Sequence, residues 1–142
     1  LMDRGAQRTG IQTRLATISG LRVYRTMPDD IQAPAAIVTP SDDFLDYHRA
    51  MARGLTVANW RVIVATSKTM TAEGQDLLDD YLSAGTGQTK SLIGALEGDR
   101  TLGGAVDDIH VSVGRSYGEV KWNEAASYFG AEVYVACYSD RQ

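Results

Sequence analysis

Residues 56–67 read TVANWRVIVATS, and this stretch decides the fold. Its large apolar side chains recur at every second position, so Trp60, Val62 and Val64 share one face of an extended chain. The opposite face carries Arg61, Ile63 and Ala65. Period two is the repeat of a β-strand, and the apolar Ile63 between more polar neighbours indicates that the second face is also partly covered. The pattern therefore predicts a central strand of a sheet.

Four further segments carry strand signals around this one. Three prolines bracket the turns and the segment nearest the N-terminus, and the last segment places Ala131, Val133, Val135 and Cys137 on one face. The predicted strands are residues 35–39, 44–48, 105–113 and 126–138. Between the last two lies a long polar stretch, residues 114–124, which we expect to form the loop of a hairpin.

A helical pattern occupies the N-terminal part of the chain. Thr9 followed by Gln12 fits a capping box, in which the two side chains satisfy free amides of a first helical turn. Ile11, Leu15 and Ile18 then form one apolar stripe at helical spacing. We expect this first helix to begin at Thr9 and to pack on the sheet.

A helical crossover is expected between the central strand and the last two strands. Thr71 starts its first helix, since the early acidic residues Glu73 and Asp76 suit the positive end of a helix dipole. Glycines in residues 85–87 break the chain, and residues 91–96 form a short second helix. This order predicts an α+β fold: a mostly antiparallel sheet of four to five strands, with the N-terminal helix and the helical crossover packed on one face. We expect a single domain over residues 1–142.

Composition is typical of a globular domain, because the 142 residues are 44% hydrophobic and 23% charged, with 14 Gly and 3 Pro. The apolar runs are far shorter than the roughly 20 residues of a membrane-spanning helix, so we expect no membrane segment. The first residues lack the apolar stretch of a secretory signal, so we expect no export by that route. Cys137 stands alone, which excludes an internal disulfide and favours a reducing compartment.

Charge is distributed unevenly along the chain. The net charge of −4 argues against a protein that binds duplex nucleic acid by neutralising phosphates. Residues 1–28 nevertheless hold five arginines against Asp3 alone. These arginines are either solvated residues of a first helix or a basic face that meets the acidic body of a neighbouring copy.

One stretch shares features with a phosphate-binding loop. Residues 85–91 combine two glycines with a Lys-Ser pair. The loop needs a glycine directly before the lysine and another five residues earlier, where this chain has Thr89 and Ala84. The stretch also follows a predicted helix instead of a strand. The glycines therefore indicate a helix end and a turn.

Candidate catalytic and metal-binding residues do not form a converging set. Asp46 with His48, and Asp108 with His110, each place two possible metal ligands at i and i+2, which is fewer than a site needs. Cys137 in an apolar strand is typical of a small core residue. We expect no catalytic residue, no cofactor and no metal, and hence a protein that is not an enzyme.

A series of segments in a fixed order carries a family resemblance. The segments are residues 15–24, 28–29, 35–38, 60–64, 78–82, 91–96, 99–106 and 128–132. In order and spacing, together with the chain length and the α+β order, they resemble the tail terminator (tail completion) proteins of long-tailed bacteriophages. The resemblance spans nearly the whole chain, although none of its pieces is a catalytic signature.

The resemblance implies a structural virion protein that acts by assembly. Such a subunit forms a six-fold ring on the head-proximal end of the tail tube, stops tube polymerisation and offers a surface to the head-tail connector. Its partners are then other copies of itself, the tail tube protein and the connector or stopper protein, and DNA passes through the lumen without specific binding. Its location is the head-tail junction of the virion, and the host cytoplasm during assembly.

The expected interface residues are basic and aromatic. Aromatic side chains give large contact area for little loss of entropy, and arginines complement an acidic neighbour. The candidates are Arg4, Arg8, Arg14, Tyr117, Trp122 and Tyr128. An equal alternative for Trp122 is that its side chain folds back over the edge of its own sheet.

Two other functions are alternatives to a tail terminator. A head-closure or connector adaptor, or another neck protein, fits the same chain length and order of elements. From a different class, the alternative is a small cytosolic ligand-binding or metal-dependent enzyme domain.

Overall fold

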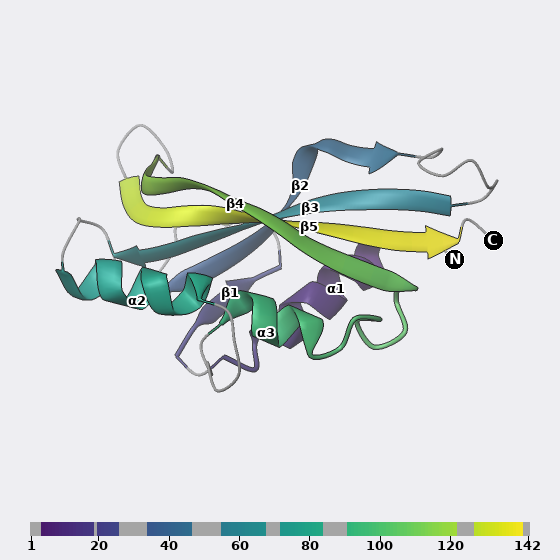
Figure 1. Ribbon diagram of the computed structural model, residues 1–142, viewed down its shortest axis with the longest axis horizontal. Helices are drawn as coiled ribbons and strands as arrows, with labels where there is room; N and C mark the ends of the chain where they lie inside the picture. Colours follow the sequence, from purple (N-terminus) through teal and green to yellow (C-terminus); the bar gives the residue numbers. More distant parts are fainter. Residues whose placement is uncertain are drawn as a thin grey trace.

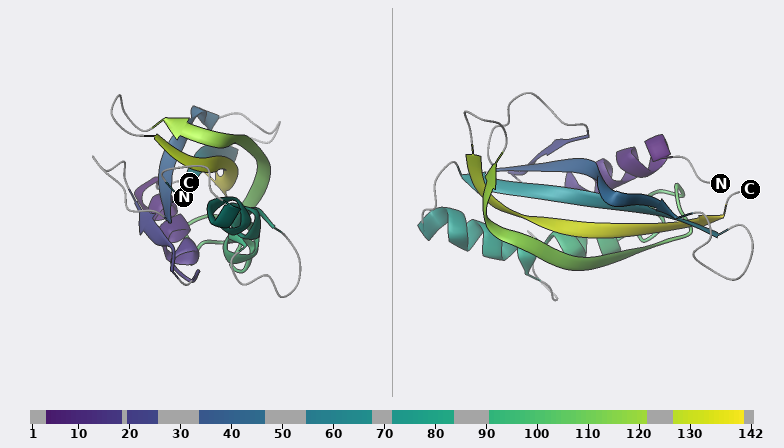
Figure 2. Two further views of the ribbon diagram at one scale, coloured as in Figure 1. Left: turned by 90° about the vertical axis from the view of Figure 1, so that its left-hand side faces the viewer. Right: turned by 90° about the horizontal axis from the view of Figure 1, so that it is seen from above.

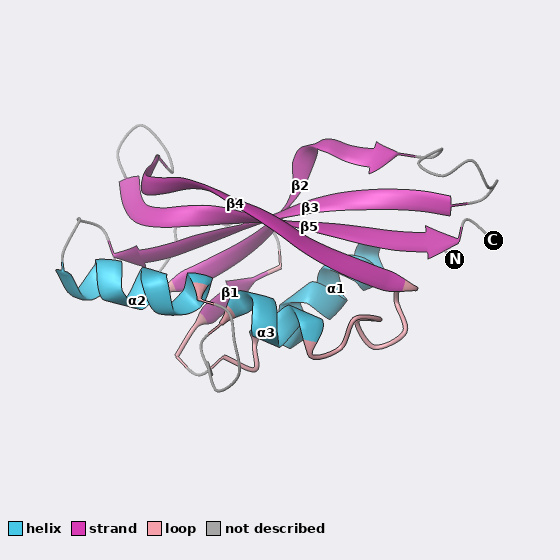
Figure 3. Cartoon of the chain, in the orientation of Figure 1, coloured by secondary structure: helices cyan, strands magenta, loops and turns pink. Residues whose placement is uncertain are grey.

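Five strands form one sheet in the order β1-β2-β3-β5-β4. The computed structural model describes residues 4–18, 20–25, 34–46, 55–67, 72–83, 91–121 and 127–140. The strands are β1 (Arg22–Tyr24), β2 (Ala35–Asp46), β3 (Leu55–Ser67), β4 (Asp108–Lys121) and β5 (Ser127–Asp140), and the helices are α1 (Arg4–Leu15), α2 (Ala72–Leu82) and α3 (Leu92–Glu97). Strands β1 and β2 pair in parallel and all other neighbours pair antiparallel (Figures 1 and 3).

Strand β3 is the centre of the sheet, as its sequence pattern predicts. It pairs with β2 on one side and with β5 on the other. Trp60, Val62 and Val64 belong to the main hydrophobic core, while Ile63 belongs to a smaller cluster on the opposite face. The smaller cluster contains Ala35, Ile37, Ile63, Ala65 and Tyr128. The prediction of a central strand covered on both faces is therefore confirmed.

The three helices lie on one side of the sheet (Figure 2). Each contributes buried apolar residues to the main core, because the helical repeat brings every third or fourth side chain to the same face. These are Ile11 and Leu15 of α1, Leu78 and Tyr81 of α2, and Leu92 and Leu96 of α3. The predicted α+β class, with an N-terminal helix and a helical crossover on one face, is confirmed.

The first helix begins at Arg4, so the predicted capping box at Thr9 is wrong. Thr9 lies within α1, where its carbonyl accepts a hydrogen bond from Thr13 Oγ1 at 2.9 Å. The helical stripe of Ile11 and Leu15 extends back to Gln7, which is fully buried. Because Gln7 is polar, a search for apolar residues at helical spacing does not detect the first turn of the helix. Ile18 is buried but follows the end of the helix.

The short helix α3 follows its predicted start. Ser91 has an extended backbone and caps the helix, because its Oγ accepts a hydrogen bond from the Gly94 N–H at 3.0 Å. Helix α2 begins at Ala72, and the expected start at Thr71 lies outside the described residues, as do residues 85–87.

Irregular pairing explains where the predicted strands differ from the observed ones. The segments 35–39 and 44–48 were expected to be separate, but β2 is continuous to Asp46, with a register shift between Pro40 and Leu45. The stretch 114–124 was expected to be a loop, but β4 continues to Lys121. Its register shifts twice against β5, beside Gly114 and Gly118. Each bulge moves the side chains out of period two, so the sequence pattern of a strand is lost.

No helix among the residues described here is both long enough and apolar enough to cross a membrane.

Candidate functional site

Two arginines of α1 lie on the ring of a buried tryptophan. The guanidinium carbons of Arg4 and Arg8 are each 5.0 Å from the Trp60 ring centroid, which is the distance of a cation–π contact. Trp60 is 1% exposed, and its Nε1 donates a hydrogen bond to Gln7 Oε1 at 3.0 Å. The central strand therefore holds both positive charges at the N-terminal end of α1.

A third arginine joins this group from the chain that follows β1. Arg25 Nε donates a hydrogen bond to Thr9 Oγ1 at 2.9 Å. Burial lowers the pKa of Arg8, and the charges of Arg25 and Arg4 lower it further. Within the described residues, Arg8 Nε is buried without a hydrogen-bond partner. We call Arg4, Arg8 and Arg25 the basic end; their repulsion favours an anionic partner.

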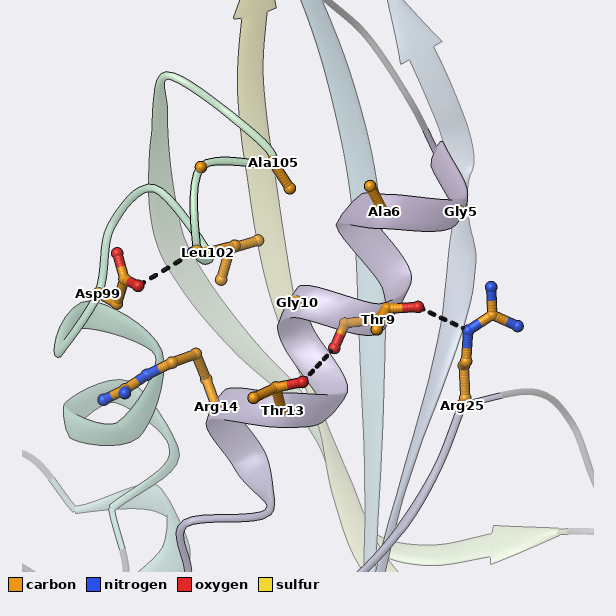
Figure 4. A pocket seen from close by; sticks show the side chains of 12 residues that line it. Gly5, Ala6, Thr9, Gly10, Thr13, Arg14, Arg25, Asp99, Leu102 and Ala105 are labelled. Atoms are coloured by element: carbon orange, nitrogen blue, oxygen red, sulfur yellow. Dashed lines mark hydrogen bonds between the residues drawn. The ribbon is translucent and has the colours of Figure 1, made fainter.

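A groove of about 760 Å³ runs beside the basic end (Figure 4). Its floor is the small-residue face of α1, and its two rims are Arg25 and the turn that follows α3. The residues that line it are Gly5, Ala6, Thr9, Gly10, Thr13, Arg14, Arg25, Asp99, Leu102, Gly103, Gly104 and Ala105. The lining is more apolar than polar, and its polar side chains are the hydroxyls of Thr9 and Thr13, the guanidinium groups of Arg14 and Arg25, and the Asp99 carboxylate.

The turn at the second rim is held by one carboxylate. Asp99 accepts hydrogen bonds from the N–H and the Oγ1 of Thr101, at 3.1 and 2.8 Å, and from the Gly103 N–H at 2.9 Å. These bonds hold the pKa of Asp99 below its ordinary value, the Thr101 hydroxyl having the largest effect. Leu102 has a left-handed backbone with φ 51° and is 4% exposed. A Cβ on Gly10 would lie 2.7 Å from Leu102 Cβ, so glycine lets the turn contact α1.

Arg14 joins helix α1 to helix α3. Its Nε donates a hydrogen bond to the Ala95 carbonyl of α3 at 2.8 Å. Its charge also contributes to the lowered pKa of Asp99. Arg14 is therefore a bridge between α1, α3 and the turn, instead of part of the basic end.

Negative charge is concentrated on helix α2. Its exposed side chains include four acids and no base, and these are Glu73, Asp76, Asp79 and Asp80. We call them the acidic end. Tyr117 of β4 adjoins it, because its hydroxyl donates a hydrogen bond to Asp79 Oδ1 at 3.0 Å and its ring packs edge-on against Phe129. Desolvation and the Asp79 carboxylate raise the pKa of Tyr117.

The two charged ends lie far apart in the molecule. Helix α2 lies at one end of the long axis, and the N-terminal half of α1 lies toward the other (Figures 1 and 2). Within one copy, the basic and acidic ends therefore do not neutralise each other.

The structure separates the residues that the sequence proposed as interface. Arg4 and Arg8 meet at the basic end, Arg14 bridges to α3, and Tyr117 lies 49% exposed beside the acidic end. Tyr128 is 1% exposed because its side chain packs in the smaller cluster, so its proposal as a contact residue is corrected. Trp122 lies outside the described residues.

Sequence reasoning missed two parts of this site. The acidic residues Glu73, Asp76 and Asp80 recur at i, i+3 and i+7, a helical stripe that the sequence already displays. Arg25 and Asp99 reach the groove only through the tertiary fold, and no local pattern brings them together.

Two of the residues weighed for metal binding and nucleophilic chemistry, Asp108 and Cys137, have structural roles. Asp108 accepts hydrogen bonds from Arg100 Nε at 2.7 Å and Arg100 Nη2 at 3.3 Å, and this contact lowers the Asp108 pKa. Burial raises the pKa of the Cys137 thiol to about 12, as expected for a core residue. The side chain of Asp46 and the whole of His48 lie outside what is described. Within the described ranges, no three His, Cys, Asp or Glu side chains gather around a possible metal position.

A scan against models of known protein families finds no match to this chain. A search of curated protein sequences finds no match either. Function is therefore inferred from the geometry of the two charged ends.

Proposed function

We propose that this protein is a structural virion subunit that assembles head to tail into a ring, as tail terminator proteins of long-tailed bacteriophages do. The observation that carries this proposal is the separation of the basic end from the acidic end along one axis. A contact between unlike surfaces on opposite ends repeats from copy to copy, and it closes into a ring where the rotation permits. The resemblance in segment order and α+β architecture supplies the virion context.

The ring would sit at the head-proximal end of the tail tube, where it ends polymerisation and meets the head-tail connector. The acidic composition, with a net charge of −4, supports a lumen along which DNA passes without binding. Under this proposal the protein has no catalytic residue and no cofactor.

The mass of the purified full chain and negative-stain imaging test the proposal. At high concentration and low salt we expect rings of about six chains, and we expect these rings to cap the head-proximal end of purified tail tubes. Caps at that end distinguish a tail terminator from a neck protein, which would bind the connector and leave bare tubes uncapped. A protein that stays monomeric alone and also fails to cap tubes overturns the proposal.

A further inference from the structure

The free edge of strand β4 carries an ion pair that takes up backbone hydrogen-bonding groups of the strand. Among the described strands, β4 has β5 on one side and no strand on the other, and it lies at the border of the sheet (Figure 2). A long edge strand is a template for pairing with another chain unless something blocks it. We infer that Arg100 and Asp108 block this edge, and that the partner which the edge fits is β4 of a second copy. The inference goes beyond the proposed function and does not depend on it.

The polar backbone groups of Ile109 lie at the free edge. The Asp107 N–H donates a hydrogen bond to the Tyr138 carbonyl at 2.9 Å, so Tyr138 directs its backbone groups toward β4. Successive residues of an antiparallel pair alternate between hydrogen-bonded and non-hydrogen-bonded positions. Cys137 therefore faces β3, and Ile109, which lies opposite Cys137, directs its N–H and its carbonyl away from β5.

Both edge-facing groups of Ile109 have side-chain partners. Arg100 Nη2 donates a hydrogen bond to the Ile109 carbonyl at 2.8 Å. Arg100 Nε and Nη2 also donate to the Asp108 carboxylate, at 2.7 and 3.3 Å, and the same carboxylate accepts a hydrogen bond from the Ile109 N–H. One ion pair therefore satisfies the donor and the acceptor that a neighbouring strand would use. We call Arg100 and Asp108 the blocking pair.

The regular part of this edge is short. Edge-facing residues recur at every second position, so the next one after Ile109 is Val111. The register of β4 against β5 then shifts between Val111 and Gly114, and such a bulge interrupts the regular edge. With the bulge on one side and the blocking pair on the other, too few groups remain for a second strand to pair with this stretch.

Without the blocking pair, the edge is complementary to itself. An antiparallel contact about a twofold axis at His110 places Ile109 of each copy opposite Val111 of the other, so donors meet acceptors in both directions. The His110 side chain is exposed and lies on the face of β4 away from the main core, to which Ile109 belongs. A second copy is the occupant because the same stretch supplies both halves of the contact.

Removing the blocking pair from the full chain tests the inference. The side chains of Arg100 and Asp108 are 48% and 51% exposed, so R100A/D108A should keep the circular dichroism spectrum of the wild type. We expect its dissociation constant for dimers, measured by analytical ultracentrifugation, to be at least about ten-fold lower than that of the wild type. The control E97A removes the other acid near Arg100, at 4.0 Å, and leaves Ile109 covered. E97A should self-associate as the wild type does.

A cysteine on the twofold axis detects the edge contact separately from a ring. In the R100A/D108A background, two copies of H110C lie opposite each other with Cα atoms about 4.5 Å apart, which permits a disulfide. We expect a covalent dimer in this background and none from H110C alone. The control S112C in the same background should give none, because its two copies lie about 13 Å apart along the strands. Cys137 stays unreacted, since it is buried and its thiol pKa is about 12.

Hydrogen exchange in the wild type gives a measurement that needs no variant. We expect the Ile109 amide to exchange at least about ten-fold more slowly than the Val111 amide, because Asp108 accepts its hydrogen although both amides face the edge. Equal rates would overturn the block. A folded R100A/D108A that self-associates as the wild type does, and that gives no H110C disulfide, would overturn the second copy as partner. The mass of the wild type and the capping of tubes decide the proposed function separately.

Discussion

At the scale of single residues, the contact between Gln7 and Trp60 positions the basic end. The indole N–H is buried in the main core, and Gln7 Oε1 is its hydrogen-bond acceptor at 3.0 Å. The guanidinium groups of Arg4 and Arg8 lie over the same ring. A buried polar pair therefore fixes the first turn of α1, on which the charged surface depends.

Replacing this acceptor should destabilise the fold. We expect Gln7→Leu to lower the free energy of unfolding by about 1–3 kcal/mol, because the Trp60 N–H then stays buried without its acceptor. Urea unfolding followed by circular dichroism measures the change. Gln12→Leu is the matched control, since Gln12 is half-buried on the same helix and its replacement should change stability by less than about 0.5 kcal/mol. Equal effects of the two variants would contradict the role of the buried bond.

Asp99 makes the turn beside the groove sensitive to acid. Its pKa in the folded protein is lowered, so its contribution to stability is complete above the ordinary aspartate pKa of about 3.9 and is lost as the pH falls through the folded value. We expect Asp99→Asn to melt below the wild type at pH 7, and the difference between the two melting temperatures to shrink as the pH falls below the ordinary aspartate pKa. Asp76→Asn, on the exposed face of α2, is the control. A constant difference at all pH values would contradict the prediction.

At the scale of elements, close packing of β5 against β3 depends on one glycine. A Cβ on Gly130 would collide with the Val64 carbonyl, which is backbone and has no other rotamer. We expect Gly130→Ala to reduce the free energy of unfolding by about 2 kcal/mol or more. Gly98→Ala is the matched change, because its Cβ meets mainly the flexible end of Arg14 and its backbone is helical. Thermal and urea unfolding should leave Gly98→Ala within about 0.5 kcal/mol of the wild type.

The sequence predicts elements well where a single repeat runs without interruption. Strand β3 keeps period two along its central stretch, and the short helix predicted over residues 91–96 is observed as α3, one residue later. Strand β4 is recognised only in its first half, since the register shifts beside Gly114 and Gly118 change which face each side chain takes. Tyr128 follows the polar stretch 114–124 in the sequence, whereas the side chains that it packs with, Ala35, Ile37 and Ile63 among them, lie far away along the chain.

The candidate site depends on tertiary structure more than the fold does. The arginines of α1 are visible as a basic segment, but their contact with Trp60 joins residues more than fifty positions apart. Arg25 reaches the same end because β1 runs beside β2, which is the one parallel pair among the described strands. Composition indicates that such charges exist, whereas only the fold shows that they converge on one end.

At the scale of the whole molecule, charge separation should make assembly depend on salt. The contact between the ends joins exposed charges, and the screening length falls from about 10 Å at 0.1 M salt to about 3 Å at 1 M. We therefore expect the mass measured by light scattering to decrease toward the 15.4 kDa monomer over this range. The melting temperature of the charge-reversed variant D76K/D80K, in which two acids of the acidic end are replaced by lysines, should change little over the same range, because the main core is apolar and is not screened.

The direction of the salt effect distinguishes an electrostatic interface from an apolar one. Excluded salts such as sulfate strengthen apolar contacts, so a ring held mainly by apolar surface would gain mass at high sulfate. A ring held by the two charged ends should dissociate in sodium chloride and re-form on dilution of the salt. An increase in mass with either salt, with no loss of assembly in the charge-reversed variant R8E/R25E, would place the contact between copies on a surface other than the two charged ends.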